Sequence, residues 1–375
     1  MHIAIIGAGV QGASAAFHLS ARGVHVTIID ANIDGRATAA GAGIICPWVS
    51  SIEDPAFLRL YIAGGEYYPE LIAVLASAGE HNLGYRRTGA MLVSGDPREL
   101  ALLERTTRQR AVPAMGDIHR LSEREAQAQF PPLRDRLGAI HIAGGARVDG
   151  RLLAAALLRA AQSQGATIMP GTASPIIEAG RAVGVTVGDQ RIPADRVIVT
   201  AGAWADRLLR QGAAIAPQRG QIVHLQLEAA DTHDWPVILP PGSHYIVPFD
   251  AGRIVAGATR ETGSGFDYRV TAAGQAEVLT EALRIAPGLG EATVVETRIG
   301  FRPIAEDGRP LIGFIPEVKD LAIGNGLGPA GLTIGPLAGR LLADLVTGQT
   351  ALIDLTPFRP ARGTSPAVGA TDSLR

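Results

Sequence analysis

The sequence has a single cysteine, Cys46, so it forms no internal disulfide and contains no Cys-x-x-Cys redox pair. This low cysteine content fits a reducing compartment. Charged residues are also few, at 19% of the chain, and the formal net charge is −2 with no run of Lys or Arg. The composition therefore gives no electrostatic argument for a nucleic-acid partner or for an anionic membrane surface.

Long apolar runs are lacking as well. No stretch reaches the ~18 uninterrupted apolar residues that a transmembrane helix requires. The first 20 residues are apolar, but no Lys or Arg precedes them, and Gly7, Gly9 and Gly12 interrupt them, which argues against a signal peptide. The histidines show no metal-ligand spacing, and no Ser-His-Asp motif or P-loop is visible. We expect a cytosolic protein, at most peripherally attached to the inner membrane, and predict no metal site.

Glycine, by contrast, is abundant, with 46 residues, and 47% of the chain is apolar. Together these values indicate a compact α/β protein with many tight turns. A chain of 375 residues is long for a single core, so we expect two domains. No internal repeat or long linker is visible, which favours two domains that interleave along the chain.

Hydrophobic patterning gives a coarse map of the elements. Residues 3–6 read as an apolar strand, 10–21 as a helix and 24–29 as a strand that stops at Asp30, which makes one βαβ unit. Further helices are predicted at 57–75, 97–110, 123–129, 149–164 and 333–346, and further strands at 90–93, 167–169, 197–199 and 321–323. A small meander is predicted over residues 176–192. Strands at 222–227, 245–248 and 254–259 indicate a second, largely antiparallel sheet.

The turn inside the βαβ unit reads G-x-G-x-x-G, from Gly7 to Gly12. Gly7 permits the tight turn, Gly9 lets the backbone approach a pyrophosphate, and Gly12 allows close packing of helix and strand. The helix N-terminus offers N–H groups to the phosphates, and Asp30, 18 positions after Gly12, is placed to accept bonds from ribose hydroxyls. This context predicts a dinucleotide site of Rossmann type. The alternative is a glycine turn in an ordinary α/β protein.

The motif alone leaves NAD, NADP and FAD open, and two other loops favour FAD. The small-residue loop 36–44 can run beside a large planar ring, while Arg36 and Thr38 can add phosphate contacts. The loop 324–333 opens directly into a helix, whose N-terminus could stabilise negative charge on the N1–C2=O edge of a reduced flavin. Each loop taken alone is equally a packing turn. No second motif of Rossmann quality appears, so no separate pyridine-nucleotide domain is predicted.

In their order, these motifs resemble the D-amino acid oxidase superfamily, most of all its glycine oxidase and bacterial D-amino acid dehydrogenase branches. The likeness runs from residue 3 to about residue 346 and includes segments 42–44, 200–204, 245–248, 255–259, 300–303 and 328–333. It implies an α/β fold in which a Rossmann-type FAD-binding domain (residues 1–85, 140–215 and 296–360) interleaves with a substrate domain (86–139 and 216–295) built on a mixed or antiparallel sheet. Residues 361–375 are expected to be a flexible tail.

The motif and the resemblance together define the expected cofactor contacts, including adenine-side contacts that the resemblance alone implies. No cysteine lies in the C-terminal loop, so FAD is expected to be held non-covalently. The residues expected to bind FAD are Gly7, Gly9, Val10, Gln11, Gly12, Asp30, Ala31, Arg36, Thr38, Ala42, Gly43, Ile44, Thr172, Ala173, Thr200, Ala201, Gly202, Trp204, Gly328, Pro329, Ala330, Gly331, Leu332 and Thr333.

Two residues carry the expected substrate site. The resemblance implies that Arg302 grips a substrate carboxylate, a task that suits the bidentate guanidinium, and that Tyr245 lies over the substrate. Alternation along the strand puts His244 on the opposite face from Tyr245. The alternatives are an Arg302 paired with Glu306 or Asp307 and a Tyr245 that packs in the core. Cys46 and Trp48 follow the loop 36–44, called the flavin-side loop below, and could line the entrance of the site or simply pack there.

The resemblance implies oxidation of a small amino acid, a D-amino acid or glycine, by hydride transfer from Cα to flavin N5. The product is an imino acid that hydrolyses to an oxo acid and ammonia. Orientation of the substrate is then the protein's main task, and we assign no catalytic base. Oxygen or a quinone-type carrier would reoxidise the flavin, and an oligomer is compatible with the sequence. The alternatives are an N-methyl or cyclic imino acid substrate, a 2-hydroxy acid, or a flavin-binding protein without turnover.

Overall fold

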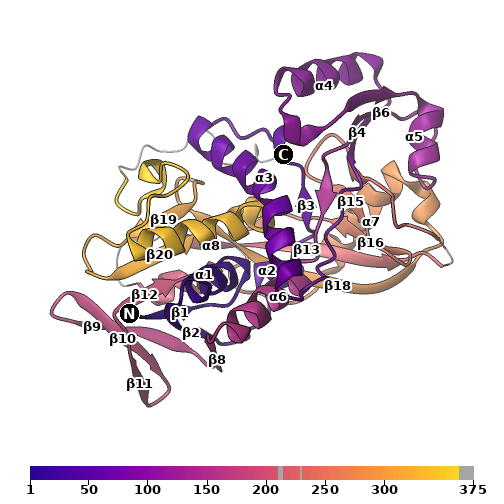
Figure 1. The fold of residues 1–375 in the computed structure, drawn as a ribbon. Helices are drawn as coiled ribbons and strands as arrows, with labels where there is room; N and C mark the ends of the chain where they lie inside the picture. Colours follow the sequence, from indigo (N-terminus) through magenta and orange to yellow (C-terminus); the bar gives the residue numbers. More distant parts are fainter. Residues whose placement is uncertain (210–213, 229, 363–375) are drawn as a thin grey trace.

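The computed structural model describes residues 1–209, 214–228 and 230–362, and its two large sheets are drawn in Figure 1. One sheet has the strand order β19-β20-β12-β1-β2-β8, parallel from β20 to β8, with β19 antiparallel at the edge. Its strands are β1 (His2–Ile6), β2 (His25–Asp30), β8 (Thr167–Pro170), β12 (Arg196–Val199), β19 (Leu311–Phe314) and β20 (Leu321–Asn325). It contains the predicted βαβ unit.

Both faces of this sheet are covered, which explains why its strands read as continuous apolar runs. On β1, Ile3 and Ile5 pack among the helices, while Ala4 and Ile6 face a second cluster that includes the strand β10. The helices are α1 (Val10–Ser20), α3 (Pro55–Ser77), α6 (Gly150–Ser163) and α8 (Gly331–Thr347). The opposite layer is the small antiparallel sheet of β9 (Ala173–Glu178), β10 (Arg181–Val187) and β11 (Gln190–Pro193), the predicted meander.

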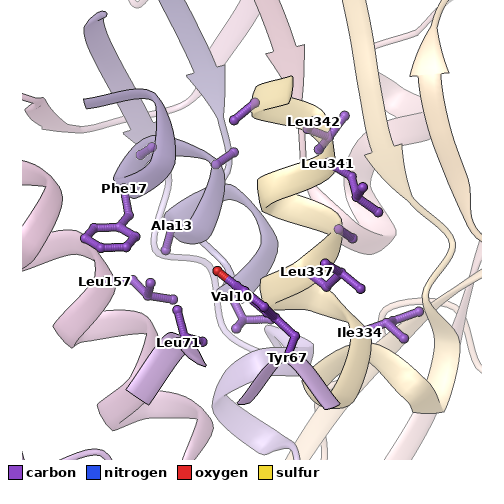
Figure 2. Close-up of a cluster of buried hydrophobic side chains, with 14 of the residues drawn as sticks. Val10, Ala13, Phe17, Tyr67, Leu71, Leu157, Ile334, Leu337, Leu341 and Leu342 are labelled. Atoms are coloured by element: carbon purple, nitrogen blue, oxygen red, sulfur yellow. The ribbon is translucent and has the colours of Figure 1, made fainter. Parts of the chain in front are cut away.

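The helices α1 and α8 are in close contact, although about 320 residues separate them. Figure 2 shows side chains of α1, α3, α6 and α8 meeting in one apolar cluster. Ser14 Oγ donates to the Pro336 carbonyl over 2.6 Å, and Arg22 pairs with Asp344. A Cβ on Gly339 would lie 2.5 Å from the Gln11 carbonyl oxygen, so a larger residue there would push the two helices apart.

The second large sheet has the order β17-β13-β16-β15-β14-β4-β6-β5, and β18 pairs with β13. It is mostly antiparallel, with a parallel β14–β4 pair, as expected for a mixed sheet. The helices α5 (Glu123–Gln129) and α7 (Ala272–Ile285) pack on one face, while Cys46 and Trp48 pack on the other. The strands are β4 (Ala90–Ser94), β5 (Ile118–Leu121), β6 (Gly138–Ile142), β13 (Ile215–Gln226), β14 (Val237–Leu239), β15 (Tyr245–Pro248), β16 (Arg253–Gly257), β17 (Glu261–Thr262) and β18 (Thr293–Ala305).

Short elements complete the described chain. Within the predicted loop 36–44 the structure has one helical turn, α2 (Ala37–Ala40), and β3 (Ile44–Ile45), which pairs with β7 (Ala146–Arg147). The helix α4 (Pro97–Gln109) contacts β4 and β6. Asp54, Asp96 and Asp149 cap the N-termini of α3, α4 and α6 with their carboxylates, which fixes where these helices begin.

The α/β fold class is confirmed, whereas the division into two domains stays a prediction. The expected boundaries at residues 140 and 296 fall inside β6 and β18, and both strands pair within the second large sheet. The flexible tail was expected from residue 361, but Arg362 is held in place: it donates hydrogen bonds to the Asp307 carboxylate and the Pro310 carbonyl. Residues 363–375 of that tail lie outside the described residues. No helix of the described chain is long and apolar enough to cross a membrane.

Candidate active site

A cavity of about 630 Å³ is lined by residues of both large sheets and of the helices between them. Its lining contains nearly all the predicted site residues. The cofactor residues among them are Gly7, Gly9, Val10, Gln11, Asp30, Ala31, Arg36, Thr38, Ala42, Gly43, Ile44, Thr172, Ala173, Thr200, Ala201, Gly202, Trp204, Gly328, Pro329, Ala330, Gly331 and Leu332, and the substrate residues are Tyr245 and Arg302.

The glycine turn after β1 is held rigidly against its neighbours. Gly7 has φ +104°, and a Cβ there would lie 2.5 Å from the Thr200 carbonyl oxygen. The Thr200 hydroxyl donates to the Gly7 carbonyl over 2.8 Å, and the Asp30 carboxylate accepts the Ala8 N–H over 2.6 Å. The turn is therefore fixed before any ligand arrives, with its backbone facing the cavity.

Two predicted cofactor residues support the cavity wall without lining it. Gly12 faces the turn itself, because a Cβ there would overlap the Gly7 carbonyl. This is the packing role expected for the third glycine of the motif. The Thr333 hydroxyl donates to the Ile44 carbonyl over 3.0 Å and bonds with Tyr61, so it ties α8 to the flavin-side loop. Their predicted direct contact with FAD has no support in this geometry.

The cavity offers polar groups of the kind that a dinucleotide requires. Both α1 and α8 begin at the cavity without a side-chain cap from their own N-cap residues, Gly9 and Ala330, although Thr38 Oγ1 accepts the Val10 N–H over 3.0 Å. The Gln11 amide nitrogen is buried in the lining and has no hydrogen-bond partner among the described residues. Such N–H groups suit phosphate and flavin oxygens. The residues present therefore fit FAD.

The flavin-side loop approaches the segment before α6 too closely for a side chain. Gly43 has φ +87°, and a Cβ on it would overlap the Val148 carbonyl oxygen. Val148 N–H donates to the Gly43 carbonyl over 2.8 Å. Of the two residues for which both lining the entrance and packing were left open, Cys46 lines the cavity and Trp48 does not. Burial raises the pKa of the Cys46 thiol to about 12, so the thiol is protonated at neutral pH.

Arg302 lies on β18 and faces neutral acceptors. Its Nη1 donates to the Thr259 carbonyl over 3.1 Å and to Gln218 Oε1 over 3.4 Å, and the guanidinium donates to the Tyr245 hydroxyl. The alternative pairing with Asp307 is wrong, because Asp307 binds Arg309 and Arg362. Burial lowers the pKa of Arg302 somewhat, but arginine remains charged at any physiological pH. The guanidinium is therefore positioned for an external anion.

Tyr245 stands at the start of β15, beside the guanidinium. Burial raises the pKa of its phenol, and the cations Arg302 and Arg260 oppose that rise. The hydroxyl therefore stays protonated and can accept from Arg302 while it donates to a ligand. The expectation for His244 was wrong: β15 begins at Tyr245, so strand alternation does not extend to His244, which lines the same cavity and lies 3.3 Å from Glu277.

Several lining residues were not predicted. They include Arg260 and Arg207, two further cations, and the polar residues Glu99, Tyr61 and Asn325. Arg260 directly follows the segment 255–259 that carries the family resemblance, so a charge at the end of that strand was the available signal. Asn325 ends β20 within the predicted loop 324–333, whereas Glu99, Tyr61 and Arg207 come from helical segments whose approach to the cavity depends on tertiary packing.

With this geometry, the fold and the site define a flavin-dependent oxidoreductase. Residues 2–345 match the family model DAO, described as FAD dependent oxidoreductase, and the chain belongs to this family. It is 46% identical to the uncharacterized oxidoreductase YurR of Bacillus subtilis (strain 168), over 95% of this chain and 98% of that protein. It is 30% identical to the glycine oxidase of Geobacillus kaustophilus (strain HTA426), over 96% of each chain.

Among solved structures, the iminodiacetate oxidase IdaA of Chelativorans sp. BNC1 is similar, with a TM-score of 0.93 and 51% identity over 96% of this chain and 98% of that chain. The predicted membership of the glycine oxidase branch is thus confirmed, and so is FAD as the cofactor. The chain is an enzyme that oxidises amines or amino acids with FAD. The alternative of a flavin-binding protein without turnover is set aside.

Proposed function

We propose that the enzyme oxidises a small secondary amine that carries two carboxylates, of the iminodiacetate kind. The observation that carries this proposal is that two guanidinium groups, Arg302 and Arg260, line one cavity and both act on the Tyr245 phenol. One cation suffices for a simple amino acid, whereas a dicarboxylate can use both. The 51% identity with the iminodiacetate oxidase over nearly the whole chain supports the same substrate class.

In this proposal Arg302 and Tyr245 hold the carboxylate next to the carbon that is oxidised, and Arg260 holds the more distant one. FAD supplies the acceptor for the hydride and is bound non-covalently. The carbon–nitrogen single bond of the substrate becomes an imine, which water hydrolyses to an oxo acid and the remaining amine. The chain's contribution is orientation and charge compensation, because a fixed near-attack geometry supplies much of the rate enhancement.

A second candidate substrate is glycine or a D-amino acid. It is supported by the 30% identity with a glycine oxidase across the chain. Such a substrate needs the Arg302–Tyr245 clamp and carries no second carboxylate that Arg260 could hold. The two candidates therefore differ in their dependence on Arg260.

An anaerobic titration of the flavin band near ~450 nm separates them. The panel is iminodiacetate, glycine, D-amino acids, sarcosine, proline and 2-hydroxy acids. We expect iminodiacetate to bleach the flavin at the lowest concentration. Arg302→Leu should raise the half-bleaching concentration of every carboxylate substrate by roughly 30-fold or more, the range for losing one partner of a buried charge pair. Arg260→Leu should raise it for iminodiacetate and leave glycine nearly unchanged.

Equal effects of Arg260→Leu on glycine and iminodiacetate would remove the case for a dicarboxylate. Unchanged bleaching in Arg302→Leu would refute the carboxylate clamp altogether. Reoxidation under air, compared with reoxidation by an artificial quinone without oxygen, identifies the electron acceptor. Acid precipitation of the protein should leave the yellow cofactor in the supernatant, which tests non-covalent binding.

A further inference from the structure

A buried polar network lies directly behind Arg302, outside the cavity lining. Thr259 is its link to the guanidinium, because the Thr259 carbonyl accepts from Arg302 over 3.1 Å. The Thr259 hydroxyl accepts the Gln221 N–H over 2.9 Å and donates to Glu261 Oε1 over 2.7 Å. Thr259 and Gln221 are almost completely buried. One residue thus joins the substrate clamp to the carboxylate of Glu261.

Glu261 is the centre of this network. Its Oε1 accepts from the Gln221 side chain over 2.7 Å as well as from Thr259, and its Oε2 accepts from Arg219 Nε over 3.0 Å and Nη2 over 2.5 Å. Arg219 is buried and also pairs with Asp267 over 3.0 Å. Burial disfavours the Glu261 carboxylate, yet these hydrogen bonds outweigh it and hold the pKa of Glu261 below its usual value.

The strand register explains why this network controls the clamp. Gln218 of β13 pairs with Arg302 of β18 on one side and with Thr262 of β17 on the other, and Arg219 pairs with Glu261. The Glu261–Arg219 pair therefore fastens β17 to the strand that carries a second acceptor for Arg302, Gln218 Oε1. A shift of β17 would move the Thr259 carbonyl away from the guanidinium.

We propose that Glu261 and Thr259 are positioning residues, which hold the Arg302 guanidinium in the orientation that binds the substrate carboxylate. This inference rests on the proposed role of Arg302 as the clamp. Neither residue lines the cavity, so neither touches the substrate. A satisfied buried network of this kind is rigid, and rigidity of the supporting groups is what sets the accuracy of an orienting side chain.

Thr259→Val and Thr259→Ser form the matched pair that tests the proposal. Valine keeps the shape of threonine but has no hydroxyl, and serine keeps the hydroxyl. The first measurement is the Kd of oxydiacetate, a dicarboxylate without an oxidisable amine, determined by calorimetry on the FAD-loaded enzyme. The others are the KM and kcat for iminodiacetate and the melting temperature. We expect Thr259→Val and Glu261→Gln to raise the Kd and KM about tenfold, with a smaller effect on kcat, as for a misplaced orienting group. Thr259→Ser should stay within about twofold of the wild type, since the network survives.

Glu296→Gln is the control, because Glu296 forms a comparable pair with Arg298 over 2.5 Å on β18 and does not touch Thr259. It should leave the Kd unchanged. If Thr259→Val and Glu261→Gln lower the melting temperature but bind oxydiacetate like the wild type, the network is merely structural and the proposal is overturned. Tighter binding by Glu261→Gln would also overturn it, since the Glu261 charge would then act by weakening the pull of Arg302.

The Arg302→Leu variant separates this proposal from the one on which it rests. If that variant binds oxydiacetate like the wild type, the clamp itself is refuted and this proposal with it. If Arg302→Leu loses binding while Thr259→Val and Glu261→Gln keep it, the clamp stands and the positioning role fails.

Discussion

Gly220 offers a test in which activity and stability should separate. It lies on β13 opposite Gly300 of β18, and a methyl group on it would stand 2.7 Å from both Nη1 and Nη2 of Arg302 and 2.8 Å from Cζ. Ordinary non-bonded contacts begin near ~3.5 Å, so Gly220→Ala must move the guanidinium by roughly 0.8 Å. The backbone at Gly220 needs no left-handed conformation, because its φ is not positive. The substitution therefore acts on the Arg302 side chain rather than on the fold.

The expected magnitude follows from that displacement. A misplacement of about 1 Å in an orienting group costs up to ~100-fold in rate, so kcat/KM for the substrate should fall by roughly 10- to 100-fold, or about 1.4–2.7 kcal/mol. Stability should hardly change, because replacing a strand glycine by alanine gains roughly 0.5–1 kcal/mol while the weakened Arg302 hydrogen bonds lose about as much.

Steady-state kinetics and thermal unfolding of the FAD-loaded enzyme check both parts. Gly95→Ala is the control, because a Cβ there would have its nearest neighbour at an ordinary 3.4 Å. A Gly220→Ala enzyme whose kcat/KM stays within about twofold of the wild type would refute the reasoning. A large fall in melting temperature would show instead that the strands, and not the guanidinium, had moved.

Three further predictions concern buried groups elsewhere. The Cys46 thiol, whose pKa burial raises to about 12, should not react with a thiol reagent in the native enzyme at pH 8. In denaturant the enzyme should take up one equivalent of the reagent. Fast labelling of the native enzyme would contradict the burial of Cys46. Arg147 is fully buried, donates to Asp250 over 2.7 Å and lies over the Phe249 ring. In urea titrations, Arg147→Ala should therefore lower the free energy of unfolding by roughly 3 kcal/mol. The control Arg191→Ala, at an exposed ion pair, should lower it by at most about 0.5 kcal/mol. Burial lowers the pKa of His18 to about 3, so between pH 6.5 and 3 the unfolded chain binds a proton that the native state does not. The free energy of unfolding should therefore fall as the pH drops from about 6.5 towards 3, by at most ~1.4 kcal/mol per pH unit. Denaturant titrations at several pH values should show a flatter slope for His18→Gln, and an unchanged slope would assign the loss to other groups.

The sequence predicted the fold best at positions where the local structure admits only one kind of residue. The strands β1, β2, β12 and β20 were predictable because burial on both faces favours apolar residues along most of each strand. The turn from Gly7 to Gly12 was predictable because no side chain fits there. The meander β9–β11 followed from alternation and its turns.

Long-range pairing limited the rest. The strand β18 was not predicted, since Gly300 and Pro303 are both unfavourable in a strand interior. In the structure position 300 has no room for a side chain, because a Cβ added to Gly300 would lie 2.7 Å from the Ala40 Cβ. The helix α7 was missed too, and it contains Gly274, where a side chain would collide with Gln221 of β13. In each case the reason for the glycine lies on an element far away in the sequence.

The candidate site divides in the same way. Arg302 and Tyr245 came from a resemblance of local motifs, and the structure brings them together. Glu261, which is joined to them through Thr259, could not be predicted, because its partner Arg219 is 42 residues away in the chain and meets it only through the register of β13 and β17. Local sequence identifies the groups that face a ligand, and strand register determines what holds those groups in place.

The contact between α1 and α8 also determines when during synthesis the enzyme can first bind its cofactor. Residues near position 10 leave the ribosome early, but the cavity is closed by the segment 328–332, which precedes and begins α8. Until that segment emerges, the apolar side chains of α1 that pack on α8 stay uncovered and are open to chaperones, whereas those that pack on α6 already have a partner. A ligand stabilises only the state that it binds, so FAD is expected to stabilise the chain fully only once segment 328–332 completes the cavity wall.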